Sequence, residues 1–446
     1  MFGENTAIKV RISMKFPGRR KTKHYFPVSG ESSRIPLEWD FSTPDELYIV
    51  GIDQLIVDVE AEVDDQVLSE NGLSKGESVV LPDDVMENLT RRLRDQNRIL
   101  GVYAGGSIGN TLHNYSVLSD DRSVALGTIS RNISVGDDAF KYICTTNSHV
   151  DFSHLLPVPG PMARALCLIT PDRERTFAIA KGVMNELTPQ AVPSEVIQKS
   201  AALLISTYLL RDESAPMFAA TIKAVKDAKA ANVPVVLSMG TSGIVRDRRD
   251  FLRDFLRDYV TVAAMNEVEA SALTGEEDPL LNCQQLLELV DLALLTVGPR
   301  GLYVAGFCDQ EYLRETKDMI HSKSIAEYNK FEYSRAMRRA DCRNEAKIFT
   351  HINPYMGGPG KVISTNGAGD AALAAVLHDM AANQYHRRRI PKSPKHVSEF
   401  LTYSSFHQVA KYANRVSFEV LKQNSPRLGR GLPEREDSLE EAYWAR

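Results

Sequence analysis

Short apolar runs alternate with amphipathic stretches along most of the chain. Residues 47–52, 201–206 and 233–238 are compact apolar runs, whereas residues 217–228 and 251–258 place apolar side chains at helical spacing. Compact runs of this kind are typical of buried strands, and the longer periodic stretches are typical of helices packed on a sheet. The alternation predicts βαβ units, and therefore an α/β protein with a central, mostly parallel sheet covered by helices on both faces.

Two hairpin-like segments interrupt this alternation. They cover residues 55–67 and 165–181, and the second contains a charged turn from Pro171 to Arg175. Because neither segment fits the βαβ rhythm, we expect the two to come together as a small, separate β-sheet.

The remaining segments differ from this pattern in composition. Residues 1–46 include a basic run, Lys15–His24, and are predicted to be an N-terminal tail. Residues 308–362 are polar without a firm period, and we interpret them as an insertion. Residues 426–446 are charged and are predicted to be a C-terminal extension on the surface. The main domain is therefore expected to span residues 47–425.

The composition is that of an ordinary globular protein. Of the 446 residues, 43% are hydrophobic and 25% are charged, and a net charge of −5 gives no reason to expect a nucleic-acid partner. No apolar run approaches the ~18 residues of a membrane-spanning helix, so no membrane partner is expected. The five cysteines are scattered and include no Cys-x-x-Cys pair. This usage fits a reducing cytoplasm.

The sharpest local signal is Asn366-Gly-Ala-Gly-Asp370, which precedes an apolar helical stretch from Ala371 to Leu377. Small residues let a backbone approach a ligand closely, and the first N–H groups of a helix point outward at the positive end of its dipole. These features are typical of a phosphoryl-binding site. Asp370, in the first turn, is placed to accept the proton of an attacking hydroxyl. The residues alone equally allow Asp370 to be the N-cap of a buried helix.

The segment Asn366–Asp370 also resembles the C-terminal signature of the ribokinase/PfkB family of carbohydrate and nucleoside kinases. Four further segments resemble family motifs in the same order, namely Gly51–Asp58, Gly105–Asn110, Asn266–Glu269 and Thr296–Gly301. The resemblance implies a ribokinase-like fold in which the small β-sheet is a lid. It also implies an enzyme that transfers a phosphoryl group from ATP to a hydroxyl acceptor.

On the acceptor side, the resemblance implies that Asp370 is the catalytic base and that Asp58 binds the sugar hydroxyls, with Asp53 as a second candidate. It implies that the backbone N–H groups of Gly367, Ala368 and Gly369 stabilise charge on the moving phosphoryl group. It also implies that Gly105 and Gly106 let a helix start pack tightly against the sugar, and that Asn110 reaches the sugar hydroxyls. A plain glycine turn is the alternative for the segment that begins at Gly105.

On the ATP side, the resemblance implies that Asn266 and Glu269 organise Mg²⁺ and the ATP phosphates through water. The residues expected to line the nucleotide channel are Thr296, Gly298, Gly301 and Asn366. A plain strand–turn–strand is the alternative for the segment from Thr296 to Gly301. The resemblance also implies a monovalent cation, typically K⁺, near the anion site.

One branch of the family matches more closely. The segments Lys15–Gly18, His113–Ser116, Tyr355–Pro359 and Gly431–Ser438 resemble the branch that acts on inosine and guanosine. We therefore expect a cytoplasmic kinase of purine salvage that phosphorylates the 5′-hydroxyl of these nucleosides. A homo-oligomer is compatible with the sequence.

Two alternatives follow from the same pattern. The acceptor could be adenosine or a free sugar, or the chain could be a non-catalytic nucleoside sensor on the same fold. The presence of Asp370, Asn266 and Glu269 argues against a sensor. The chain has no Gly-x-x-x-x-Gly-Lys-Ser/Thr motif, and the turn at Gly105 lacks Gly-x-Gly-x-x-Gly spacing, so P-loop and dinucleotide-binding proteins are excluded.

Overall fold

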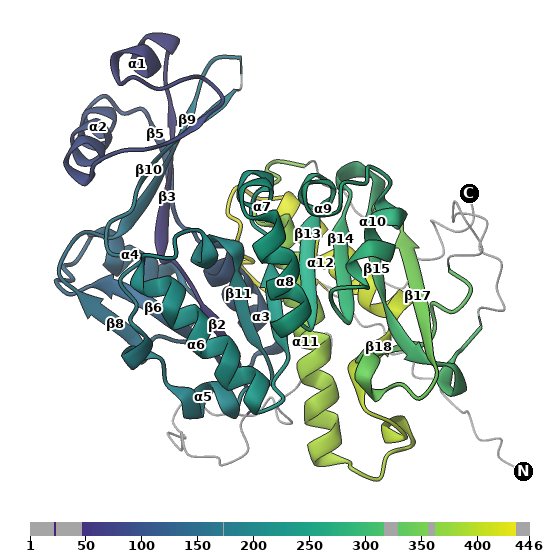
Figure 1. Cartoon of the computed structure of the whole chain (residues 1–446). Helices are drawn as coiled ribbons and strands as arrows, with labels where there is room; N and C mark the ends of the chain where they lie inside the picture. Colours follow the sequence, from purple (N-terminus) through teal and green to yellow (C-terminus); the bar gives the residue numbers. More distant parts are fainter. Residues whose placement is uncertain (1–21, 24–46, 173, 316–328, 356–361, 434–446) are drawn as a thin grey trace, which may run out of the picture.

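The computed structural model describes residues 22–23, 47–172, 174–315, 329–355 and 362–433 (Figure 1). These residues form a twelve-stranded sheet, a separate five-stranded sheet and a two-stranded pairing of β1 (Thr22–Lys23) with β19 (Leu432–Pro433). Within these ranges, no helix combines the length and the hydropathy that a membrane span requires.

The large sheet is parallel in its central part. Its strands run in the order β18-β16-β15-β14-β13-β12-β11-β2-β6-β7, with β17 paired to β15 and β8 paired to β6. Strands from β7 to β14 in this order are mutually parallel, and those beyond β14 are antiparallel. The bounds are β2 (Ile49–Ile52), β6 (Ser123–Ser130), β7 (Val150–Asp151), β8 (Leu155–Val158), β11 (Leu203–Ser206), β12 (Val235–Ser238), β13 (Val262–Asn266), β14 (Leu292–Thr296), β15 (Leu302–Asp309), β16 (Arg335–Met337), β17 (Glu345–Ile352) and β18 (Phe400–Ser405).

Helices cover both faces of this sheet, as the alternation predicts. Consecutive residues of β2 show why: Ile49 packs into the core on one face and Val50 into the core on the other, and both are fully buried. On the first face lie α3 (Ser107–Ser119), α11 (Ala368–Arg389) and α12 (Phe406–Leu421). The second face carries α5 (Ser194–Gln198), α6 (Pro216–Ala230), α7 (Ser242–Asp247), α8 (Arg249–Tyr259), α9 (Glu267–Thr274) and α10 (Pro279–Leu286).

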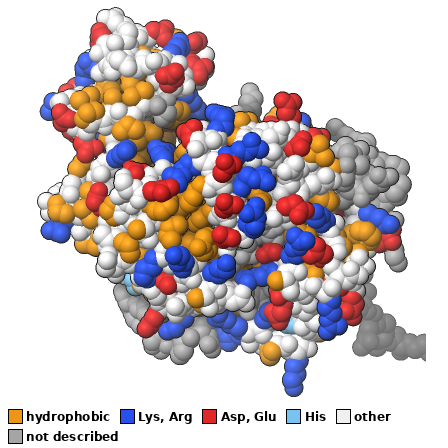
Figure 2. Space-filling view, in the orientation of Figure 1, with side chains coloured by type: hydrophobic (Ala, Val, Ile, Leu, Met, Phe, Trp, Pro, Cys, Tyr) orange, Lys and Arg blue, Asp and Glu red, His pale blue; other side chains and the backbone are white. Residues whose placement is uncertain are grey.

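The small sheet projects from the body with its own core (Figures 1 and 2). Its order is β4 (Ser78–Val80), β10 (Arg175–Ala180), β9 (Ala163–Ile169), β3 (Ile56–Glu62) and β5 (Ile99–Ala104). It also carries α1 (Asp65–Glu70) and α2 (Asp83–Asp95). Figure 2 shows Lys and Arg side chains at the junction between the projection and the body.

The hairpin prediction was right for only one of the two segments. Strands β9 and β10 form an antiparallel hairpin, but β3 is a single strand that leads into α1. Its neighbours are β9, which is parallel to it, and β5, which is antiparallel and lies about 40 residues later in the chain. Strand β3 alternates buried and partly exposed residues, a pattern that shows a strand but not its partner.

Residues 308–362, interpreted as an insertion, extend the large sheet where they are described. All eight residues of β17 pair with β15, and β16 lies between β15 and β18. Strand β17 is only partly buried, so its sequence lacks the clear apolar period of the central strands. Residues 316–328 and 356–361 lie outside the described residues.

The prediction that residues 426–446 lie on the surface was wrong for the part that is described. Arg427, Leu428 and Leu432 are buried, and each residue is at most 5% exposed. A charged residue predicts exposure only when it has no buried partners, and Arg427 has several. Residues 434–446, and most of the predicted tail 1–46, lie outside the described residues.

Candidate active site

The predicted site residues gather at one edge of the large sheet. The chain runs from β2 to β6 on one side of it and, after β7 and β8, returns past β2 to β11 on its other side, so the strand order reverses at β2. In open parallel sheets, ligands bind outside the carboxyl ends of the strands at such a switch point. The residues that follow these carboxyl ends are Asp53 after β2 and Thr207 after β11, and Figure 1 shows the small sheet above the same edge.

The segment Asn366–Asp370 opens α11 at this edge. Gly367 is the N-cap with a φ of 77°, a left-handed conformation that favours glycine. The first helical hydrogen bond runs from the Ala371 N–H to the Gly367 carbonyl. The N–H groups of Ala368, Gly369 and Asp370 precede it and point outward at the positive end of the helix. These N–H groups lie where the sequence predicts an anion site.

The Asp370 carboxylate faces the start of α3. Ser107 Oγ donates to Asp370 Oδ1 at a distance of 2.6 Å, and Asn110 Nδ2 donates to Asp370 Oδ2 at 3.2 Å. Burial raises the pKa of Asp370 to about 6, while these two hydrogen bonds and the charge of Arg427 oppose the increase. A carboxylate with this pKa is ionised at neutral pH and can accept a proton, as a general base must.

The turn at Gly105 and Gly106 brings two further carboxylates to α3. A Cβ at Gly105 would collide with the Asp58 carboxylate, and one at Gly106 would lie 2.7 Å from Asp53 Oδ2. Gly106 also has a φ of 85° as the N-cap of α3. These glycines are therefore required by close approach to Asp58 and Asp53, which is more specific than a plain turn.

Asp53 and Asp58 differ in their partners. Asp53 is 3% exposed and accepts hydrogen bonds from Tyr142 Oη at 3.2 Å and from the Gly109 N–H. Asp58 is half-buried, and no hydrogen bond from another described residue reaches its carboxylate. Burial raises the pKa of each to about 7, and Arg427 opposes that increase in both. The oxygens of Asp58 are thus available to a ligand, whereas those of Asp53 already bind the protein.

Two residues that the sequence did not single out complete this cluster. The Arg427 guanidinium donates to Asn110 Oδ1 at 2.9 Å and to Tyr142 Oη at 3.0 Å. Tyr142 comes from α4 (Asp138–Thr145). No sequence signal identified either residue, because Arg427 lies in a charged segment and Tyr142 in an ordinary amphipathic helix.

Asn266 and Glu269 form a capping box at the start of α9. Asn266 Oδ1 accepts from the Glu269 N–H, and Glu269 Oε2 accepts from the Asn266 N–H; each distance is 2.9 Å. Burial raises the pKa of Glu269 to about 7, and the charge of Asp370 adds to this increase. Within the described residues no cluster of three or more His, Cys, Asp or Glu could hold a metal alone. The capping box uses Asn266 Oδ1 and Glu269 Oε2, and the second carboxylate oxygen of Glu269 is of the type that would hold, through water, a magnesium ion arriving with ATP phosphates.

The two glycines of the predicted nucleotide loop, Gly298 and Gly301, lie in different surroundings. A Cβ at Gly298 would meet no atom within 4 Å, whereas one at Gly301 would collide with the Ile352 carbonyl of β17. Both glycines have positive φ values, and Thr296 is the last residue of β14. Packing on β17 therefore explains Gly301, and Gly298 faces open space.

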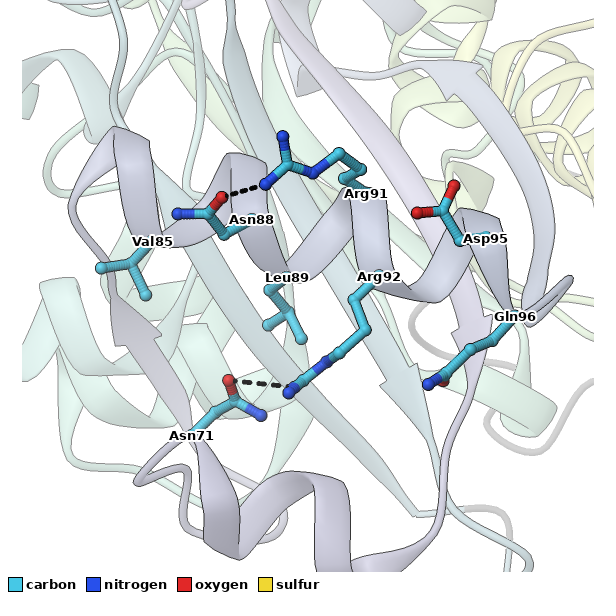
Figure 3. Close-up of a pocket in the computed structure, with 8 residues that line it drawn as sticks. All are labelled: Asn71, Val85, Asn88, Leu89, Arg91, Arg92, Asp95 and Gln96. Carbon is cyan, nitrogen blue, oxygen red and sulfur yellow. Dashed lines mark hydrogen bonds between the residues drawn. The ribbon is translucent and has the colours of Figure 1, made fainter.

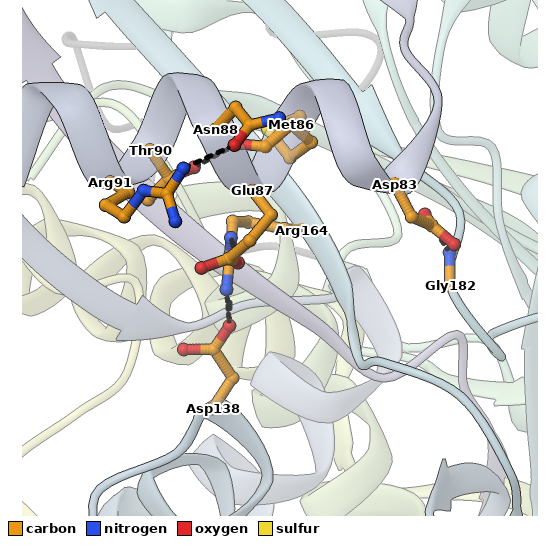
Figure 4. Close-up of polar contacts among 9 residues, drawn as sticks. All are labelled: Asp83, Met86, Glu87, Asn88, Thr90, Arg91, Asp138, Arg164 and Gly182. Atoms are coloured by element: carbon orange, nitrogen blue, oxygen red, sulfur yellow. Dashed lines mark hydrogen bonds and ion pairs between the residues drawn. The ribbon is translucent and has the colours of Figure 1, made fainter.

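Contacts between the small sheet and the body border the site. Arg175 on β10 donates to Asn366 Oδ1 at 3.4 Å. Arg164 on β9 joins α2 to α4 through ion pairs with Glu87 at 2.9 Å and with Asp138 (Figure 4). Figure 4 also shows Asp83, at the start of α2, accepting from the Gly182 N–H at 3.2 Å.

A shallow pocket lies away from these residues, on the outer part of the small sheet (Figure 3). Its lining contains none of the predicted site residues. The lining residues are Asn71, Val85, Asn88, Leu89, Arg91, Arg92, Asp95 and Gln96.

The fold and the paired helix starts define a kinase of the pfkB type, and comparison with known proteins agrees. Residues 80–318 match the model of the pfkB family carbohydrate kinase. The chain belongs to this family, and the family and fold predictions are confirmed.

Its relatives are more specific. The chain is 53% identical over 437 residues to the guanosine-inosine kinases of Escherichia coli strain K12 and of Escherichia coli O157:H7, covering 97% of this chain and 100% of each relative. Among solved structures, adenosine kinase from Sinorhizobium meliloti has a TM-score of 0.63 at 22% identity, covering 90% of this chain and 100% of that one. A probable sugar kinase from Rhizobium etli CFN 42 has a TM-score of 0.62 at 19% identity, covering 90% and 98%.

Proposed function

We propose that the protein transfers the γ-phosphoryl group of ATP to the 5′-hydroxyl of guanosine and inosine, which yields the nucleoside 5′-monophosphates used in purine salvage. The observation that carries this proposal is the Asp370 carboxylate at the open start of α11, held beside Asp58 by the first turn of α3. The 53% identity to guanosine-inosine kinases over almost the whole chain supports the choice of acceptor.

In this proposal Asp58 accepts hydrogen bonds from the ribose hydroxyls, and Asp370 accepts the proton of the 5′-hydroxyl as it attacks. The N–H groups of Gly367, Ala368 and Gly369 stabilise charge on the moving phosphoryl group. Asn110 keeps Asp370 oriented, and Gly105 and Gly106 leave room for the carboxylates. Asp53 remains a candidate substrate residue, although its protein partners make an anchoring role the stronger one.

The nucleotide would extend from the start of α11 toward the ends of β13 and β14. There Asn266 and Glu269 would hold Mg²⁺ through water, and Thr296, Gly298, Gly301 and Asn366 would border ATP. Bound magnesium neutralises charge on the transferred phosphoryl group. A K⁺ ion near the anion site belongs to the same proposal, and its test is the turnover rate in potassium against choline salts.

The small sheet is proposed to close over the nucleoside and exclude water, which favours transfer to the hydroxyl over hydrolysis. The contacts of Arg175 with Asn366 and of Arg164 with Asp138 lie at the junction that this motion would use. We further propose that the enzyme acts in the cytoplasm, since its five cysteines are all unpaired. Assembly into a homo-oligomer is compatible with this function.

The test is ADP release from ATP and Mg²⁺ with guanosine, inosine, adenosine or ribose as acceptor, with the product identified by chromatography. The proposal expects turnover on guanosine and inosine, with the 5′-monophosphate as product. Turnover confined to adenosine or ribose would make the acceptor wrong and leave the kinase chemistry intact. Binding of guanosine, seen as a thermal shift, without any turnover would favour a nucleoside sensor.

A further inference from the structure

The segment Pro426–Leu428 docks behind the two helix starts. Pro426 packs against Gly367, whose missing side chain makes the approach possible. The buried side chain of Asn114 pairs with both sides of Arg427: its Nδ2 donates to the Pro426 carbonyl at 3.3 Å, and its Oδ1 accepts from the Leu428 N–H at 2.7 Å. The chain near its C-terminus is thereby fixed to α3 and to the turn that opens α11.

This docking places the Arg427 side chain inside the protein. The residue is 5% exposed, and its guanidinium carbon lies 4.9 Å from the centroid of the Tyr142 ring. It donates to Asn110 Oδ1 at 2.9 Å, to the Gly105 carbonyl at 3.0 Å, to Tyr142 Oη at 3.0 Å and to Thr146 Oγ1 at 2.6 Å. A planar guanidinium can span several acceptors in fixed directions, which an ammonium group cannot do.

The bond to Asn110 has a consequence for Asp370. Because Asn110 Oδ1 accepts from Arg427, its Nδ2 is turned toward Asp370 Oδ2 at 3.2 Å. Without the guanidinium, the amide could rotate and present its oxygen to the carboxylate, which would repel it. The bond to the Gly105 carbonyl holds the turn against which Asp58 packs.

The charge of Arg427 acts on the same groups. It opposes the increase in the pKa of Asp53, Asp58 and Asp370 that burial causes. Other ionisable groups that interact with Asp370 are Asp53 after β2, Asp58 on β3, Tyr208 after β11 and Glu269 on α9, and their negative forms favour protonation. Arg427 is a cation whose charge acts on all three aspartates.

We infer that Arg427 is a positioning residue for phosphoryl transfer: it holds Asn110 and the Gly105 turn so that Asp370 and Asp58 face the acceptor. The acceptor site therefore includes a residue close to the C-terminus, outside the segments that resemble the family motifs. This inference rests on the proposed function.

A purely structural role would make Arg427 an anchor for the C-terminal segment alone. Arg335 provides a matched control for such a role. It donates to the Thr402 carbonyl at 2.9 Å, to the Lys395 carbonyl at 2.6 Å and to Asn383 Oδ1 at 2.6 Å. Asn383 lies on α11 about 20 Å along the helix axis from Asp370, at 1.5 Å per residue.

The experiment compares wild type, Arg427→Met, Arg427→Lys and Arg335→Met in kcat and KM for guanosine over a range of pH. Arg427→Met is expected to lower kcat about 100-fold, the scale of a misplaced catalytic group. It should also move the acidic limb of the kcat profile to higher pH, because the base loses its neighbouring cation. Arg427→Lys keeps the charge, so the acidic limb of its kcat profile should stay near the wild-type position. Its kcat should lie between those of Arg427→Met and wild type.

Arg335→Met should lower the melting temperature without moving the limb. The inference would be overturned if folded Arg427→Met kept both the wild-type kcat and the wild-type position of the acidic limb of the kcat profile. It would also be overturned if the acidic limb moved equally in Arg335→Met. Should Arg427→Met fail to fold, Arg427→Lys replaces it, and a kcat equal to wild type would overturn the inference. Wild type that does not phosphorylate guanosine would overturn the proposed function and this inference with it.

Discussion

Two glycine turns open two helices at the same edge of the sheet, and they differ in what fills the space around them. At the start of α3, Gly105 and Gly106 are pressed against the carboxylates of Asp58 and Asp53, and Asp53 already accepts from the N–H of Gly109. At the start of α11, Gly367 packs on Pro426, but a Cβ at Gly369 would meet no atom within 4 Å.

The difference separates two uses of glycine that sequence motifs do not distinguish. At α3, glycine makes room for the protein's own carboxylates, and the positive end of the helix is partly neutralised by Asp53. At α11, the carboxylate of the first turn, Asp370, is bound by Ser107 and Asn110 of α3, and Gly369 leaves open space at the helix start, where an anionic ligand can approach the first N–H groups. Under the proposed function, the turn at α3 serves the carboxylates that bind the acceptor, and the turn at α11 serves the phosphoryl group.

The largest expected effect is that of Asp370→Asn. The substitution keeps the shape of the side chain but removes the proton acceptor, and general bases contribute about 10²–10⁴ in rate. We expect kcat to fall by that factor while guanosine and ATP still bind, as measured by steady-state kinetics and calorimetric titration on one preparation. A kcat within about tenfold of wild type would contradict the role of Asp370.

Gly369→Ala tests the open turn. The new methyl group meets no protein atom, and alanine is favoured over glycine in a helix by about 0.5–1 kcal/mol, so the melting temperature should hold or rise. Turnover should nevertheless fall about 100-fold, because the methyl group displaces the phosphoryl group from its N–H donors. An unchanged kcat would show that the phosphoryl group lies elsewhere.

Gly105→Ala tests the crowded turn and should behave in the opposite way. Its methyl group would collide with the Asp58 carboxylate and displace it from the acceptor. The loss of hydrogen bonds to a charged group, about 1.5–3 kcal/mol, should raise the KM for guanosine about 10–100-fold. The melting temperature should fall as well, and a variant with wild-type KM and stability would contradict the packing described here.

The smallest effect is that of pH on the wild type. Burial raises the pKa of Asp370 to about 6, and the proposed base acts in its deprotonated form. Turnover should therefore rise as pH increases through about 6 and level off above it, whereas kcat/KM for guanosine should keep rising to about 7, where Asp58 ionises. Rates measured with coupling enzymes in excess at every pH provide the check, and a flat kcat through pH 6 would argue against Asp370.

Much of this architecture follows from the sequence. Period and run length predicted the parallel core, because strands such as β2 are buried on both faces and contain few polar residues. The turn at Asn366–Asp370 predicted an anion site, because backbone geometry follows from small residues at a helix start. Strands β4 and β5 were missed, since partly exposed strands carry a weak pattern.

Arg427 could not be predicted by the same reasoning. Its role depends on contacts with Asn110 and Tyr142, which lie about 300 residues earlier in the chain. Local composition marks such a residue as exposed, and only tertiary packing shows that it is buried. The distinction between Asp53 and Asp58 likewise depends on Tyr142 and on the Gly109 N–H.

The most direct test of the contrast between the two turns is a crystal structure with guanosine, ADP, Mg²⁺ and aluminium fluoride as an analogue of the phosphoryl group in transfer. We expect the fluoride to lie about 3 Å from the N–H groups of Ala368 and Gly369, with the 5′-oxygen beside Asp370 and the ribose hydroxyls on Asp58. A fluoride at the start of α3, or ribose hydroxyls bound at the α11 turn, would contradict it.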